Sequence, residues 1–163
     1  MANSERQIRL MTFRVGNDLF VLDIMTIRQI IAYPGTTPVP KAPDFVEGII
    51  VLRNEVVPVV DLRQRLRPEL PPAERTPLVL ILDSSAGTIG FKVDEVRRII
   101  TVDPAAILPA PRLVRGLRGE LFIGVIKEAD DVYLLLDPET LLSSDEKEEL
   151  RRADLHEAMS SRT

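Results

Sequence analysis

The sequence predicts an all-β protein built from two small β-barrels and followed by one C-terminal helix. Short aliphatic segments separated by Gly, Asn, Asp or Pro recur along the chain of 163 residues, which is typical of strands joined by tight turns. Segments far apart in the chain also have similar sequences, as expected after an internal duplication. A single stretch near the C-terminus combines the length and the polarity of an exposed helix.

Nine segments have the length and the composition of buried strands, and each is bounded by turn residues. They are IRLMTFRVG (8–16), LFVLDI (19–24), VEGIIVL (46–52), EVVPVVD (55–61), PLVLILD (77–83), TIGFKV (88–93), VRRIITV (96–102), LFIGVIK (121–127) and DVYLLLD (131–137).

Three helical elements are expected at polar positions. Short helical turns follow Asp61 and Asp137, and each aspartate is expected to cap its turn by accepting hydrogen bonds from free backbone N–H groups. A longer helix covers about residues 144–157. Ser143 and Glu146 have the spacing of a capping box at its start.

Two halves of the chain can be aligned with one another. Residues 19–31 match 88–100 without a gap at an offset of 69, and residues 48–66 match 124–142 at an offset of 76. Aliphatic strands can match by chance, and that is the alternative explanation. Shared Gly, Pro and strand-ending Asp in the same order favour an internal duplication instead.

The repeats cover about residues 8–66 and 76–142, and a proline-rich connector, 67–75, joins them. Each repeat has about five short strands, too few to bury both faces of an open sheet. We therefore expect each to curl into a small barrel, because closure removes exposed edges. A binding groove is expected between the two halves. Together they form one domain, 1–143, followed by a helix and tail, 144–163.

Composition excludes several classes of protein. The net charge of −4 and an aromatic content of 4% without Trp disfavour nucleic-acid binding, which needs a basic face or stacking rings. Without cysteine there are no disulfides or thiolate metal sites. The polar N-terminus is unlike a secretory signal, and no apolar run approaches the roughly 20 residues that span a bilayer. A soluble, cytoplasmic protein is expected.

No catalytic set is evident. The lone histidine, His156, lies in the polar helix, and the sequence contains no G-x-S-x-G, H-E-x-x-H, P-loop or G-x-G-x-x-G motif. Asp61, Asp83, Asp94 and Asp137 end strands, where Asp usually caps or turns the chain. We expect no enzyme activity, no cofactor and no metal, and a function exerted through protein contacts, since abundant aliphatic residues favour exposed contact patches.

Three arginines gather in one loop. Arg112, Arg115 and Arg118 lie in the segment PRLVRGLRGE. They could bind an acidic partner surface, because guanidinium pairs with carboxylates in two-point fashion. A solvated loop is the simpler explanation, and both interpretations stay open.

Long stretches of the chain resemble the CheW family of chemotaxis coupling proteins. The similarity is carried by MTFRVGNDLFVLDIMTIRQII, TPVPKAPDFVEGIIVLRNEVVPVVDLRQRL, LVLILDSSAGTIGFKVDEVRRII, ILPAP and YLLLDPETLL, within about residues 8–142. The resemblance implies two five-stranded SH3-like barrels, somewhat interwoven, with a groove between them. It also implies a non-catalytic adaptor without cofactors that is recruited to membrane-associated receptor arrays.

The resemblance further implies partners and contact residues. The partners are the regulatory domain of the histidine kinase CheA, the cytoplasmic hairpin tip of chemoreceptors, and other CheW-like domains, with no nucleic acid and no membrane insertion. It assigns no kinase-contact residues. The residues that it places on the receptor surface are Ile27, Gln29, Ile30, Arg53, Asn54, Thr88 and Ile89.

Arg53 is the most informative of these residues. It matches the family arginine associated with receptor coupling, and a rigid hairpin could hold its guanidinium against a carboxylate or a helix-end carbonyl. Alternatively, Arg53 could link the two barrels through backbone carbonyls.

Three departures from the family pattern are present. Gln29 stands where Glu is usual, Val51 replaces Asn, and Asn54 replaces Gly, although Asn tolerates a left-handed turn. An adaptor of a non-flagellar chemosensory pathway and, more remotely, an OB-like nucleic-acid-binding protein are the alternatives.

Overall fold

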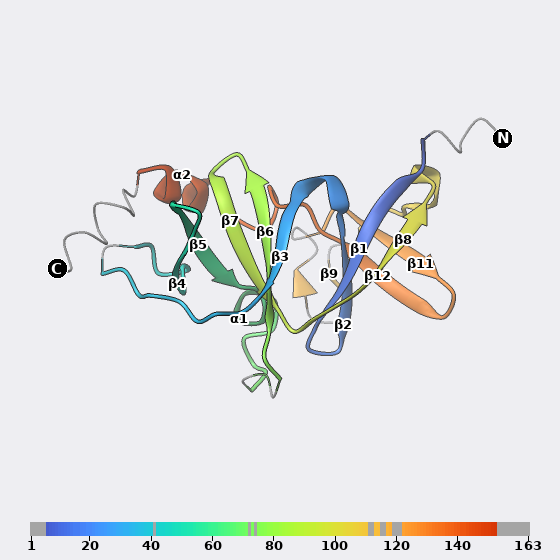
Figure 1. The fold of residues 1–163 in the computed structure, drawn as a ribbon. Helices are drawn as coiled ribbons and strands as arrows, with labels where there is room; N and C mark the ends of the chain where they lie inside the picture. The colour runs from blue at the N-terminus through green and yellow to red at the C-terminus, as the bar shows by residue number, and fades with distance from the viewer. Residues whose placement is uncertain are drawn as a thin grey trace.

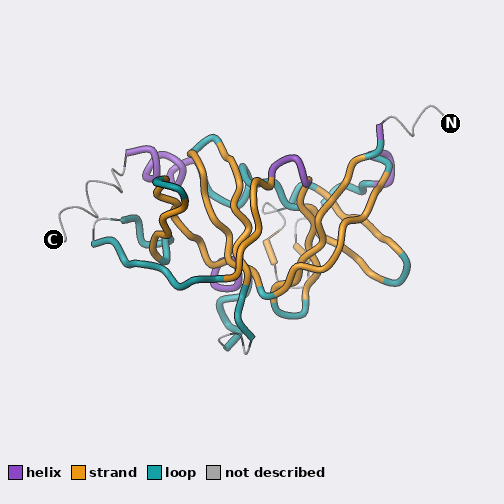
Figure 2. Tube along the Cα trace, in the orientation of Figure 1, coloured by secondary structure: helices purple, strands orange, loops and turns teal. Residues whose placement is uncertain are grey.

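Two five-stranded sheets, each curled around its own core, dominate the fold (Figure 1; strands in orange in Figure 2). The computed structural model describes residues 6–40, 42–71, 73, 75–110, 113–114, 117–118 and 122–152. The first sheet has the order β11-β12-β2-β1-β8 and the second has the order β3-β6-β7-β5-β4. An all-β fold with two five-stranded units and a C-terminal helix is thereby confirmed.

The elements have the following bounds. The first sheet contains β1 (Ile8–Val15), β2 (Asp18–Asp23), β8 (Glu95–Val102), β11 (Gly124–Glu128) and β12 (Asp131–Leu135). The second contains β3 (Ile27–Ala32), β4 (Gly48–Leu52), β5 (Glu55–Asp61), β6 (Leu78–Ser84) and β7 (Gly87–Val93). A separate pair is formed by β9 (Leu113–Val114) and β10 (Leu117–Arg118). The helical elements are η2 (Ile24–Thr26), α1 (Leu62–Leu66), η3 (Pro104–Ala106) and α2 (Ser144–Arg152).

The expected helix caps are present. Asp61 accepts hydrogen bonds from the backbone of Arg63 and Gln64 at the start of α1, and Ser143 and Glu146 form the capping box. Asp137 accepts from the Glu139 N–H at 2.8 Å, but a turn rather than a helix follows it. Across the described ranges, no helix combines the length and the apolar character needed to cross a bilayer.

Each sheet takes strands from both halves of the sequence. The first sheet combines β1 and β2 with β8, β11 and β12, while the second combines β3, β4 and β5 with β6 and β7. In Figure 1 this mixing appears as blue strands beside orange ones, and one blue strand beside green ones. The expectation that each repeat closes its own barrel is therefore wrong, whereas the interweaving implied by the family resemblance is observed.

The strand pairing supports a duplication. If β1, β2, β8, β11 and β12 are replaced by their repeat counterparts β6, β7, β3, β4 and β5, the order of the first sheet becomes that of the second. Each sheet also holds one parallel pair. Leu135 pairs with Val21 in one sheet and Val59 with Gly90 in the other, positions related by the same offsets of 76 and 69 that align the sequence.

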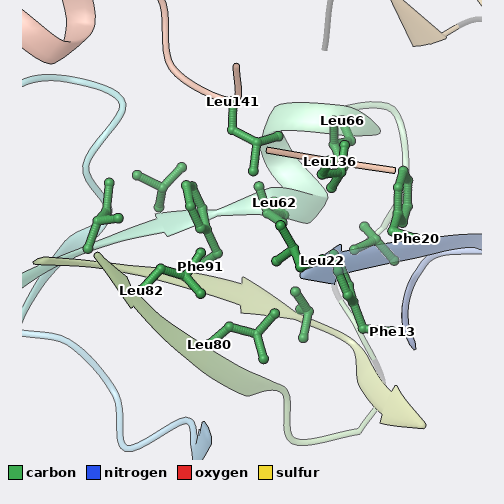
Figure 3. Close-up of a cluster of buried hydrophobic side chains, with 14 of the residues drawn as sticks. Phe13, Phe20, Leu22, Leu62, Leu66, Leu80, Leu82, Phe91, Leu136 and Leu141 are labelled. Atoms are coloured by element: carbon green, nitrogen blue, oxygen red, sulfur yellow. The ribbon is translucent and has the colours of Figure 1, made fainter. Parts of the chain in front are cut away.

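The largest hydrophobic cluster lies between the sheets. Phe13, Phe20 and Leu22 from the first sheet pack with Leu80, Leu82 and Phe91 from the second, and with leucines from α1 and the C-terminal segment (Figure 3). We call this cluster the inter-barrel core. Smaller clusters lie within each sheet, around Leu10 and Tyr133 in the first and around Val57 and Ile81 in the second. The cluster between the two sheets therefore buries more hydrophobic residues than the cluster within either sheet.

The segment pattern misses strand β3. Arg28 and Gln29 interrupt its aliphatic run, and the pairing with β6 is irregular between Ile27 and Gln29. The duplication provides the missing signal, because β3 corresponds to the predicted strand 96–102, which forms β8 with an irregularity at the matching place. Bulges of this kind redirect side chains at functional edges.

The two tyrosines should respond oppositely to loss of the hydroxyl group. Tyr133 is fully buried, and its hydroxyl has no hydrogen-bond partner among the described residues, so Tyr133→Phe is expected to stabilise the protein by about 1 kcal/mol. Tyr33 donates to Glu47, so Tyr33→Phe should destabilise it by a similar amount. Urea unfolding of both variants tests the pair, and a destabilised Tyr133→Phe would show that the buried hydroxyl is satisfied.

Candidate functional site

The β4–β5 hairpin ends in a two-residue turn with left-handed backbone. Arg53 has φ of 47° and Asn54 has φ of 67°, and Leu52 and Glu55 form the last cross-strand pair. Positive φ at both central positions characterises the type I′ turn, whose twist matches that of the strands. Asn54 suits this conformation, as expected from the sequence, but Arg53 adopts it at a cost of roughly 1 kcal/mol.

The side chain of Arg53 is directed to solvent. The residue is exposed, and in the described part of the chain no hydrogen bond or ion pair involves its guanidinium. The alternative in which Arg53 links the barrels through backbone carbonyls therefore gains no support. Strained residues with free polar groups tend to lie at functional sites, which singles out this tip.

A second arginine binds three strands together beside the tip. Arg28, at the irregular part of β3, donates from Nη1 to Thr88 Oγ1 on β7 at 2.8 Å. The same nitrogen lies 3.4 Å from Glu55 on β5 and 3.4 Å from Asp83 on β6. The positive charge of Arg28 is thus already balanced by two carboxylates, whereas that of Arg53 is not.

Glu55 remains ionised in this arrangement. A hydrogen bond from Thr88 is the largest influence on the Glu55 carboxyl and lowers its pKa below the usual 4.5. Desolvation opposes this effect, and the contact with Arg28 adds to it. Since Glu55 directly follows the turn, a fixed negative charge lies two residues along the chain from Arg53. A partner must therefore fit a mixed surface, not a uniformly basic one.

Apolar side chains flank these charges. Met25, in η2, is 86% exposed, and Val51, next to the hairpin turn, is 54% exposed. Asp23 fixes η2 by accepting from the Met25 N–H at 2.9 Å. The hairpin turn, the β6–β7 turn and η2 all lie along the upper side of the molecule in Figure 1. We call this surface the tip patch, and its residues are Met25, Arg28, Val51, Arg53, Asn54, Glu55, Asp83 and Thr88.

Several of the sequence-predicted residues lie on or near the tip patch. Arg53, Asn54 and Thr88 belong to it, although 35 residues separate Arg53 from Thr88 in the chain. Ile27 and Ile30 are half-buried against the inter-barrel core, and Gln29 is exposed on the other side of β3.

Ile89 is placed differently from the expectation. It is 1% exposed and belongs to the inter-barrel core, because alternation along β7 turns it inward next to the outward Thr88. This burial removes Ile89 from the candidate contact residues. His156, Arg112 and Arg115 lie outside the described residues, as does the side chain of Arg118.

Sequence reasoning missed Arg28, Met25 and Glu55. A charged residue inside the aliphatic run IRQII was the available signal for Arg28. Nothing local indicates its partners, because Glu55, Asp83 and Thr88 are 27, 55 and 60 residues away.

In the second repeat, the described residues form no equivalent patch. Its hairpin, between β11 and β12, carries Ala129 and Asp130 where the first carries Arg53 and Asn54, and Ala129 has φ of 55°. A left-handed residue is therefore kept at the turn, but the guanidinium is not. Since alanine adopts the left-handed conformation at the matching turn position, a hairpin of this length does not require arginine there, and a contact function explains Arg53 better.

An open pocket lies at the opposite side of the molecule from the tip patch. About 570 Å³ of space lies between the β1–β2 turn, α1 and the connector, lined by Arg14, Gly16, Arg63, Asp94 and Glu95 among others. Two of its three described arginines are paired, Arg14 with Glu95 and Arg63 with Asp94. Arg75, which also lines the pocket, has no ion pair or hydrogen bond among the described residues, but it lies in the connector and not on a left-handed turn as Arg53 does.

Known proteins share this sequence and fold. The CheW-like domain family matches residues 9–146. The chain is 30% identical to the chemotaxis protein CheW of Treponema pallidum, with 92% of this chain and 91% of that protein covered, and 30% identical to that of Rhizobium meliloti, with 85% and 90% covered. The scaffolding protein TtCheW of Thermoanaerobacter tengcongensis has the same fold, with a TM-score of 0.76 at 24% identity and coverage of 85% and 90%. The chain thus belongs to the CheW-like domain family and is a chemotaxis coupling adaptor.

Proposed function

We propose that this adaptor couples chemoreceptors to the histidine kinase CheA and acts through contacts rather than catalysis. The single observation that carries the receptor part is the unpaired guanidinium of Arg53, held on a left-handed turn beside paired charges. One surface, the tip patch, contacts the cytoplasmic hairpin tip of a receptor. A separate surface, whose residues remain unassigned, binds the kinase regulatory domain.

The chemistry of the tip patch suits an amphipathic helical hairpin. Arg53 can hold a carboxylate or the free carbonyls at a helix end, and such charge-assisted bonds are strong and directional. Met25 and Val51 offer apolar area on either side of the charged groups. Glu55 repels a second acidic group, which makes the contact selective for the spacing of charges on the receptor.

Recruitment to receptor arrays follows from this arrangement. Single contacts between an adaptor and a receptor tip can be small and weak, and simultaneous binding of a kinase domain and other CheW-like domains raises the effective local concentration. The protein is therefore proposed to join membrane-associated arrays without inserting into the membrane.

Replacing Arg53 by alanine should separate the two binding functions. Loss of a charge-assisted hydrogen bond is expected to weaken binding of a receptor cytoplasmic fragment about 10-fold or more, while calorimetric affinity for the CheA regulatory domain stays within about twofold of wild type. Kinase control by receptor should fall in parallel.

The matched control is Arg98→Ala, which removes an arginine from β8 in the other sheet, where its side chain is 55% exposed and lies 3.9 Å from Glu128. Circular dichroism checks the fold of both variants. Equal effects of the two substitutions would show that general charge, and not the tip patch, governs receptor binding. Absence of any binding to the kinase domain would overturn the adaptor proposal for CheA.

A further inference from the structure

The last strand of each repeat, β5 or β12, belongs to a parallel pair. Each of these two strands is followed by a segment that crosses from its own sheet to the other sheet. We call residues 61–71, which follow β5, the first strap, and residues 136–152, which follow β12 and include α2, the second strap. They are repeat counterparts, since Asp61 and Asp137 stand at the offset of 76 and both cap the segment that follows. Figure 1 shows them at opposite sides of the molecule, with α1 below and α2 above.

The first strap holds the β1–β2 turn. Arg67 Nε lies 2.7 Å from Asp18 Oδ2, and Arg63 pairs with Asp94. Asp94 in turn accepts from the Gly16 N–H at 2.6 Å. A carboxylate bound to the strap therefore caps a backbone amide in the turn.

The second strap holds the β6–β7 turn in a corresponding way. Glu139 accepts from the Ser85 N–H at 2.8 Å and from the Ser85 hydroxyl, and Arg151 Nη1 lies 3.5 Å from the Ser85 carbonyl oxygen. Ser85 and Gly16 are repeat counterparts, and so are Glu139 and Arg63. The two straps differ in the carboxylate that accepts from the turn amide. In the second strap it is Glu139, a residue of the strap, whereas at the first strap it is Asp94, which the strap binds through Arg63.

The second strap is anchored at several points. Glu146 forms a two-point pair with Arg65 of α1, and Lys147 Nζ lies 3.1 Å from Glu139. Leu150 is 7% exposed and packs in the inter-barrel core. Burial alone raises the pKa of Glu139, but hydrogen bonds from Ser85 and the contact with Lys147 outweigh burial and lower it.

The turn held by the second strap carries part of the tip patch. Asp83 and Thr88 form a cross-strand pair on either side of it, and both contact Nη1 of Arg28. Ser85 is two residues from Asp83 and three from Thr88. A displacement of the turn therefore reaches Arg28, and through Arg28 it reaches Glu55 beside Arg53.

We propose that Glu139 is a positioning residue that sets the geometry of the tip patch through Ser85. The C-terminal segment thereby becomes an input to the receptor surface: when the second strap is docked, Asp83 and Thr88 hold Arg28 in place, and when it is released they do not. This inference rests on the proposed receptor-binding function of the tip patch. The first strap contacts the β1–β2 turn, and its described contacts do not link it to the tip patch.

The test uses Glu139→Gln in the full chain. The substitution should raise the hydrogen-exchange rate of the Ser85 amide at least 10-fold and shift the NMR signals of the Thr88 amide and the Arg28 side-chain Nε–H. Affinity for the receptor fragment should fall 3- to 10-fold, with affinity for the kinase regulatory domain unchanged. Glu149→Gln is the control, because it removes the same charge from an exposed position of α2 that has no contact with the turn among the described residues. Glu148 is unsuitable, since its partner Arg151 reaches the Ser85 carbonyl.

The outcomes separate this inference from the function on which it rests. Faster exchange at Ser85 without changes at Thr88 and Arg28 would overturn the inference, and so would equal effects of Glu139→Gln and Glu149→Gln. If Arg53→Ala weakens receptor binding while Glu139→Gln does not, the strap is only structural. If neither variant affects receptor binding, the receptor function itself fails, whatever the NMR signals show.

Discussion

Phe91→Ala is expected to destabilise the protein by about 3–5 kcal/mol, the largest effect of any single substitution considered for this chain. Phe91 is fully buried on β7 and packs in the inter-barrel core with Leu80, Leu82 and residues of the first sheet (Figure 3). Truncation leaves a cavity. The neighbouring residues cannot move far enough to fill it, because hydrogen bonds in the sheets hold their backbone in place. Since domains of this size are stable by only about 5–15 kcal/mol, the variant should be marginal at 37 °C.

The shape of its unfolding curve is as informative as the midpoint. Because each sheet contains strands from both repeats, and the inter-barrel core joins the sheets, both halves should unfold together in one transition. Urea unfolding followed by circular dichroism and by hydrogen exchange tests this expectation. Leu108→Ala, at an exposed position, is the control and should change stability by less than about 0.5 kcal/mol. Two separate transitions in Phe91→Ala would contradict a shared core.

Lys92→Met is expected to cost about 2–3 kcal/mol. Lys92, on β7, pairs with Glu47 and lies 3.3 Å from Asp61, and its ammonium group stands 4.5 Å from the centre of the Tyr33 ring. Removing the cation leaves two partly buried carboxylates without their counter-charge. The cost is below the 3–5 kcal/mol known for fully buried pairs, because these side chains keep some contact with water.

The pH dependence of stability provides an independent check. Burial alone raises the pKa of Glu47, but hydrogen bonds from Lys92 and Tyr33 outweigh it and lower the pKa below 4.5. The contribution of Glu47 is therefore complete above the unfolded-state pKa and is lost as the pH falls through the lower native value. In Lys92→Met this acid-dependent loss should shrink. Lys127→Met, at an exposed position on β11, should leave the pH profile unchanged, and an equally steep acid loss in Lys92→Met would refute the assignment.

Local patterns in the sequence determined the strands, turns and caps. Aliphatic runs ended by Gly, Asn, Asp or Pro predicted nine strands, because burial and turn formation depend on residues close in the chain. Asp61 and the pair Ser143 and Glu146 were recognised as caps for the same reason. The duplication was also visible, since gap-free matches of glycine and aspartate positions survive divergence. The family resemblance added Arg53 and Asn54 at a turn whose backbone the structure then explained.

Only the tertiary structure decided which strands share a sheet and which side chains share a surface. The parallel pairs of β12 with β2 and of β5 with β7 join segments far apart in sequence, and no local pattern encodes such pairing, so a barrel from each repeat was expected in error. Ile89 turned inward and Thr88 outward because β7 lies against the inter-barrel core. Arg28 became part of the tip patch because three strand ends converge on it. Strand formation is a local property, whereas burial and charge pairing are fixed by long-range packing, which is why the hairpin could be found from the sequence and its surroundings could not.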